Sequence, residues 1–155
     1  MKNINIFLIL SFIFLHLSSP IYAKNSFFSF ISPSRPEVRQ QHTQSLLVET
    51  QKELQNKFDY LTRLRGVLGK RIQSPPYTRD YSLAVSKLNQ FDSLSKNFPP
   101  LLSQFNENTN QVATTSMSTV LSDIHTQSLP VWYNLQTLQK LLVESLRSII
   151  WAPRL

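Results

Sequence analysis

The sequence contains no cysteine and only two glycines among its 155 residues. Without cysteine, the chain forms neither a disulfide framework nor a thiolate metal site, so its stability must come from apolar burial. Average glycine usage is about 7%. Nucleotide-binding loops, hairpin turns and tight barrel corners use glycine because it adopts positive φ freely. The shortage of glycine therefore argues against all-β and Rossmann-type folds.

The first 23 residues follow the order of a secretory signal peptide. Lys2 precedes an apolar run at 6–15, and a short segment ends at Ala23. The run is shorter than the roughly 20 apolar residues of a membrane-spanning helix. We therefore predict cleavage after Ala23 and a secreted or periplasmic protein. The bulky Ile21 near the cut leaves an uncleaved membrane anchor open as the alternative.

Two further regions follow the signal sequence. Residues 24–33 form an N-terminal apolar arm that is rich in phenylalanine, and residues 34–155 form the expected helical domain. The chain is basic, with a formal net charge of +7 at pH 7. A basic exported chain has acidic proteins and anionic membrane surfaces as candidate partners, whereas nucleic acid is a poor candidate.

The apolar periodicity after residue 34 is helical. Ser34 and Glu37 have capping-box spacing, and leucines recur every seven residues from Leu47 to Leu68. This pattern predicts one long helix that ends near Ile72. The prolines at 75–76 break it, because proline lacks the backbone N–H that continues a helix.

Three more segments follow the proline break. A second helix is expected from Thr78 or Asp80 to Phe98; the prolines at 99–100 stop it and pre-set the start of the next segment. Residues 101–128 are either one weak helix or two pieces joined near Asn108. The last helix is expected to begin at the Ser-Leu-Pro sequence 128–130. Together these segments predict an all-α fold, an antiparallel up-and-down bundle of about four helices with a long first helix.

The nine residues RLRGVLGKR, at 63–71, contain both glycines and four basic residues. They lack the spacing of a phosphate-binding loop and follow a helical pattern instead of a strand. The favoured interpretation is a helix end, where cations complement unpaired carbonyls and Gly69 takes a left-handed conformation. A processed peptide precursor is an alternative. Gly-Lys-Arg at 69–71 resembles the amidation signal of neuropeptide precursors, and the final Pro-Arg-Leu resembles pyrokinin-type peptides.

Residues suited to catalysis are few. Ser93 and Lys96 match S-x-x-K, but the companion motifs of penicillin-recognising enzymes are missing. The residues at i, i+4 spacing from His42 and His125 are not metal-ligating types, and the pair formed by Glu49 and Glu53 fits a solvated helix face. We therefore expect no enzymatic activity, no catalytic residue, no metal site and no cofactor.

The expected function is that of an exported helical interaction protein with a basic corner at 63–79, whose partner is a protein with an acidic face. The residues expected to bind are Arg63, Arg65, Lys70, Arg71 and Arg79. The alternative is an amphipathic protein that binds a membrane surface. Its candidate anchor is the apolar end of the last helix at 149–151, with Arg147 and Arg154 beside it.

Overall fold

The computed structural model describes residues 36–73, 79–110 and 117–154, which belong to the second of two units divided after Arg35. The predicted signal peptide, the apolar arm and the capping Ser34 lie outside the described residues and stay predictions. The described helices are α2 (Pro36–Gln73), α3 (Ser82–Ser95), α4 (Phe98–Asn110) and α5 (Met117–Ile150).

The long first helix is confirmed as α2, which has 38 residues. Pro36 stands at its start, where a missing N–H breaks no intrahelical bond. Of the leucine stripe, Leu47, Leu54 and Leu61 are buried, and Leu68 packs against the core from a partly buried position. The helix continues to Gln73, so the prediction that Gly69 ends it in a left-handed conformation is wrong.

The predicted second helix is divided into two. α3 ends at Ser95, the chain turns at 96–97, and α4 begins at Phe98, whose ring is buried. Pro99 and Pro100 therefore lie in the first turn of α4 and do not mark the end of a helix through Phe98. The Asn97 carbonyl accepts a bond of 3.2 Å from the N–H of Leu101, which closes that first turn.

The last helix begins earlier than its sequence predicts. α5 starts at Met117 and includes Pro130, so the expected start at 128–130 is wrong. Ser128 does not cap a helix there: its Oγ donates a bond of 2.8 Å to the carbonyl of His125, inside α5. The apolar stripe continues from Ile124 to Val131 across the proline. For the third segment, the two-piece alternative is confirmed, since α4 ends at Asn110 and α5 follows.

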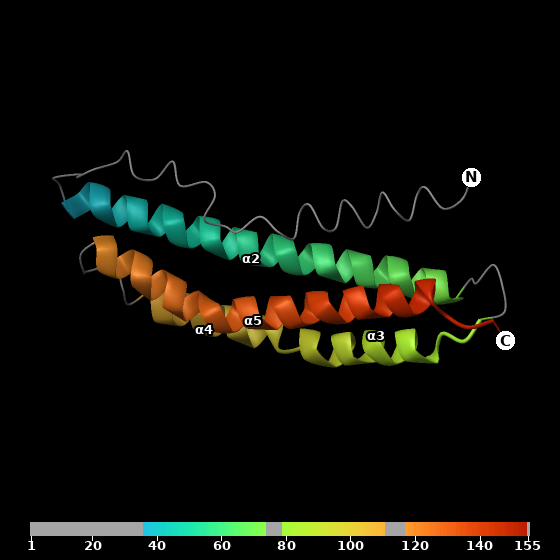
Figure 1. The fold of residues 1–155 in the computed structure, drawn as a ribbon. Helices are drawn as coiled ribbons and strands as arrows, with labels where there is room; N and C mark the ends of the chain where they lie inside the picture. Colours follow the sequence, from blue (N-terminus) through green and yellow to red (C-terminus); the bar gives the residue numbers. More distant parts are fainter. Residues whose placement is uncertain (1–35, 74–78, 111–116, 155) are drawn as a thin grey trace. The chain divides into compact units, whose positions relative to one another are not determined.

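The described residues of the second unit form three rods instead of four. α3 and α4 follow one another along α5, and α2 lies along α5 as well (Figure 1). α2 and α5 run in the same direction, while α3 and α4 run in the opposite one (Figure 1). The all-α prediction is confirmed for the described residues, in which no strand forms, but an up-and-down bundle of four antiparallel helices is not confirmed.

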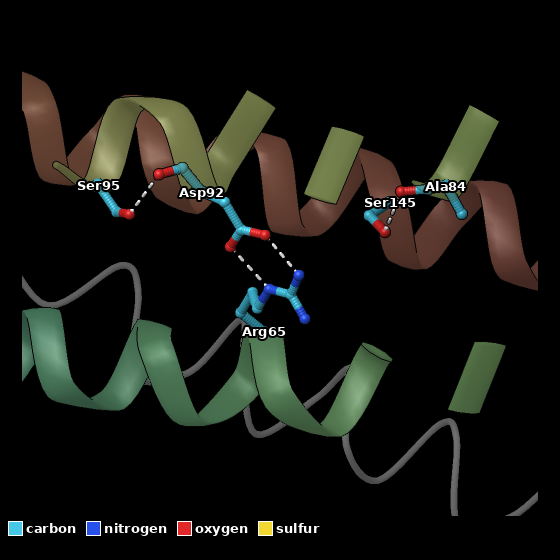
Figure 2. Close-up of polar contacts among 5 residues, drawn as sticks. All are labelled: Arg65, Ala84, Asp92, Ser95 and Ser145. Atoms are coloured by element: carbon cyan, nitrogen blue, oxygen red, sulfur yellow. Dashed lines mark hydrogen bonds and ion pairs between the residues drawn. The ribbon is translucent and has the colours of Figure 1, made fainter. Parts of the chain in front are cut away.

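One core runs between the rods. Its fully buried members come from every described helix, and Phe98 stacks on Phe58 with ring centroids 4.0 Å apart. Ala84 and Ser145 are also completely buried, and the Ser145 hydroxyl donates a bond of 3.2 Å to the Ala84 carbonyl (Figure 2). Two small side chains at this position allow the backbones of α3 and α5 to approach closely. The close approach fixes α3 beside the C-terminal part of α5.

Candidate interaction surface on the basic half of the bundle

Charge is distributed unevenly along the bundle. Two contacts mark the middle of the bundle. The ring of Phe98 stacks on that of Phe58, and Lys57 Nζ lies 5.0 Å from the ring centroid of Trp132. We define the basic half as residues 58–73, 79–97 and 133–154, which carry ten Lys and Arg against four Asp and Glu. The basic residues are Arg63, Arg65, Lys70, Arg71, Arg79, Lys87, Lys96, Lys140, Arg147 and Arg154, and the acidic ones are Asp59, Asp80, Asp92 and Glu144. In the other half, residues 41–57, 98–109 and 122–132 carry two basic residues against four acidic ones.

Arg65 is committed to a contact between α2 and α3. Its Nε donates a bond of 2.8 Å to Asp92 Oδ1, and its Nη2 lies 2.5 Å from Asp92 Oδ2 (Figure 2). The hydrogen bond from Arg65 to Asp92 raises the pKa of the arginine. Such a two-point pair fixes the geometry of both side chains. Arg65 therefore holds α2 against α3 in the basic half, and the Asp92 carboxylate compensates most of the positive charge of Arg65.

Arg79 is also engaged within the fold. Its Nη1 donates to the carbonyls of Ile150 and Ala152 at 3.4 and 3.5 Å, where a cation complements the partial negative charge of a helix C-terminus. Its backbone pairs with that of Arg154 in an isolated antiparallel bridge, and the Asp80 N–H donates to the Pro153 carbonyl at 3.1 Å. Arg79 thus holds the start of α3 against the end of α5.

The other three predicted binding residues are exposed. Arg63, Lys70 and Arg71 all lie on α2 within its last three turns. Arg63 and Lys70 flank Val67, which is 61% exposed, on one face of the helix. The structure therefore brings the five predicted residues to the same half of the bundle but divides them into two engaged arginines and three exposed cations. Their binding role stays a prediction.

The two glycines of this segment have different surroundings. A Cβ on Gly66 would meet nothing within 4 Å, whereas a Cβ on Gly69 would lie 2.8 Å from Arg65 Nη1. Gly69 therefore leaves the space across which the Arg65 guanidinium reaches Asp92. This explains a helical glycine that the sequence assigned to a helix end.

Substituting each glycine by alanine tests this difference. We expect Gly66→Ala to raise the free energy of unfolding by about 0.5–1 kcal/mol, because alanine is favoured over glycine in a helix interior and its Cβ would meet no neighbouring atom. Gly69→Ala gains the same propensity but displaces the Arg65 guanidinium, so its gain is expected to be smaller. Urea unfolding followed by circular dichroism measures both. Equal gains in the two variants would contradict the role of Gly69, and Gly69→Ala made in an Arg65→Ala background is the control.

Sequence reasoning missed one ion pair and one exposed apolar side chain in the basic half. Lys87 Nζ lies 2.8 Å from Glu144 Oε2, and this hydrogen bond lowers the pKa of the Glu144 carboxyl. Leu83, at the start of α3, is exposed, and it falls outside the apolar stripe that the sequence suggested. The spacing of residues within one helix reveals neither, because both depend on the register between α3 and α5.

The residues weighed for catalysis belong to different elements. Ser93 and Lys96 are exposed at the end of α3, Glu49 and Glu53 are exposed on α2, and His42 and His125 lie on α2 and α5. Among the described residues, no group of three or more His, Cys, Asp or Glu side chains has the arrangement of a metal site. None of the helices within the described ranges contains an apolar stretch long enough to span a bilayer.

The basic half therefore presents a surface on which exposed Lys and Arg side chains outnumber exposed Asp and Glu. Comparison with known proteins identified no relative of this chain: no family model, no curated protein sequence and no solved structure matches it.

Proposed function

We propose that the protein is an exported, non-enzymatic interaction module that binds the acidic face of a partner protein through its basic corner. The observation that carries this proposal is the exposure of Arg63, Lys70 and Arg71 on a half of the bundle with ten basic and four acidic residues. Oppositely charged surfaces attract at long range, which speeds the encounter and orients the partner. The engaged Arg65 ties α2, the helix that presents these cations, to α3 through Asp92.

The alternative of a processed peptide precursor has less support. Gly69, Lys70 and Arg71 lie inside α2, which continues to Gln73. Cleavage at a dibasic pair requires the chain to leave its helical conformation. Leu68 and Ile72, which flank these residues and pack partly buried against the core, oppose local unfolding. The same placement suits a binding surface, because a helix holds the cations in fixed positions.

Binding of poly-L-glutamate, as a model acidic polypeptide, tests the proposal. We expect the affinity of the exported protein to fall as sodium chloride rises from about 0.05 M to about 0.3 M, since salt screens exposed charges. The triple variant Arg63→Glu, Lys70→Glu, Arg71→Glu is expected to weaken binding at least tenfold, or about 1.4 kcal/mol. Isothermal titration calorimetry gives both quantities.

The matched control reverses three exposed lysines outside the basic corner at 63–79: Lys52→Glu in the other half of the bundle, and Lys96→Glu and Lys140→Glu in the rest of the basic half. It changes the net charge by the same amount, so only the position of the charges differs. The proposal requires the control to keep most of the wild-type affinity. Equal losses in the two triple variants would mean that net charge alone drives binding, which would overturn the assignment to the basic corner.

A further inference from the structure

Trp151 projects into solvent at the C-terminal end of α5. Its neighbours in sequence, Ile149 and Ala152, are buried, whereas Trp151 is 81% exposed. The backbone around it is held, since the Trp151 N–H donates to the Arg147 carbonyl at 3.0 Å and the Asp80 N–H reaches Pro153. The exposed indole is therefore presented by an ordered backbone, and core packing accounts for only part of the apolar cluster at 149–151.

Leu83 lies beside this end of α5. The two antiparallel helices are aligned by the Lys87–Glu144 ion pair at 2.8 Å and by the bond from Ser145 to the Ala84 carbonyl (Figure 2). Because the helices are antiparallel, the residue one turn before Lys87 on α3 lies level with the residue one turn after Glu144 on α5. This register places Leu83, which is 60% exposed, next to the turn that carries Arg147 and leads to Trp151. Two large apolar side chains thus meet solvent at one end of the bundle.

Cations surround the two exposed apolar side chains. Arg147, one turn before Trp151, and Arg154, three residues after it, are both exposed. The Glu144 carboxylate nearby is paired with Lys87, and the Asp80 carboxylate accepts a bond of 2.9 Å from the N–H of Ser82. The combination of tryptophan, an aliphatic side chain and arginines is typical of surfaces that lie at the boundary between lipid headgroups and acyl chains.

We infer that Trp151, Leu83, Arg147 and Arg154 form a membrane-contact surface that binds anionic phospholipid bilayers. Trp151 and Leu83 enter the headgroup region, while the two arginines bind lipid phosphates. A bilayer accepts a few projecting side chains, whereas a specific protein complex of standard size buries about 800 Å² on each partner. The net positive charge of the basic half favours an anionic bilayer. This inference uses residues separate from the exposed cations of the basic corner and goes beyond the proposed function.

Tryptophan fluorescence tests the inference directly. In a Trp132→Phe background, Trp151 is the only tryptophan of the chain. We expect its emission to shift to shorter wavelength with vesicles containing about one-third phosphatidylglycerol in phosphatidylcholine, and to stay unchanged with phosphatidylcholine alone. Brominated acyl chains are expected to quench it. The exported protein is used, and its helical circular dichroism spectrum verifies that the substituted chain folds.

Vesicle flotation provides a second measurement that keeps Trp132. Trp151→Ser, and separately Arg147→Glu with Arg154→Glu, are expected to lower partitioning into the anionic vesicles about tenfold or more. The matched control is Tyr133→Ser, which removes an aromatic side chain that is 63% exposed on the same helix, away from its end. This control is expected to partition like the unsubstituted protein.

Three results would overturn the inference. One is an unchanged Trp151 emission with anionic vesicles, and another is an equal loss of flotation in Tyr133→Ser and Trp151→Ser. The third is a Trp151 shift produced by poly-L-glutamate but not by anionic vesicles, which would assign the surface to an acidic polypeptide. The variant with Arg63, Lys70 and Arg71 reversed distinguishes a failure of this inference from a failure of the proposed function. It removes the cations of the basic corner but keeps the four residues of the membrane-contact surface, so its Trp151 emission reports on that surface alone.

Discussion

Replacing Phe98 by alanine is expected to lower the free energy of unfolding by about 3–5 kcal/mol. Phe98 is only 1% exposed, and its ring stacks on that of Phe58 at the middle of the bundle. It is also the first residue of α4, so its ring holds the junction between α3 and α4 against α2. The truncation leaves a cavity that the neighbouring helices refill only in part. Urea unfolding followed by circular dichroism measures the loss.

Two control variants show whether the loss in Phe98→Ala comes from the buried ring. Phe98→Leu keeps most of the buried volume and is expected to cost less than the alanine variant. Val48→Ala removes an apolar side chain of α2 that is mostly exposed, and its effect is expected to stay within about 0.5 kcal/mol. A loss below about 1 kcal/mol for Phe98→Ala would show that the junction does not depend on this ring.

The second large effect is expected at Pro130, with the opposite sign. Pro130→Ala is expected to raise the free energy of unfolding by about 1–3 kcal/mol, because proline inside a helix costs about 3 kcal/mol relative to alanine. Pro130 is exposed and has no N–H for the carbonyl one turn earlier in α5. The earlier part of α5 is inclined to the later part, as expected for a helix interrupted by proline (Figure 1).

Pro99 supplies the matched control for this substitution. It is exposed in the first turn of α4, where no intrahelical bond needs its N–H, so Pro99→Ala is expected to gain much less stability. Thermal unfolding of the two variants gives the comparison. A loss of stability in Pro130→Ala would instead show that the inclination of α5 is required for its packing against α2 and α4.

The local pattern of the sequence predicted the long first helix well. The leucines that recur from Leu47 define one face, and the prolines at 75–76 follow directly after the helix. Both signals act within a few residues, so they can be read without the rest of the fold. The split between α3 and α4 was harder, because Phe98 continues the apolar spacing of α3 but is buried as the first residue of α4.

Pro130 shows why local rules fail inside a packed helix. A proline two residues after a serine, as in Ser128-Leu129-Pro130, suggested a helix start, yet α5 continues through it. The apolar stripe on both sides, from Ile124 to Leu138, is buried against the other rods. Burial of this stripe in one continuous helix outweighs the missing hydrogen bond, and the energy of that burial depends on neighbours that are distant in sequence.

The sequence alone determined that the described chain is helical and strongly basic, because scarce glycine, apolar periodicity and formal charge are properties of residues and their spacing. The tertiary structure decided which charges are available. Arg65 and Arg79 are engaged by partners far along the chain, while Trp151 and Leu83 are left in solvent. Pairing and exposure are set by the register between helices, and residues 27 or 71 positions apart come together only after the rods pack.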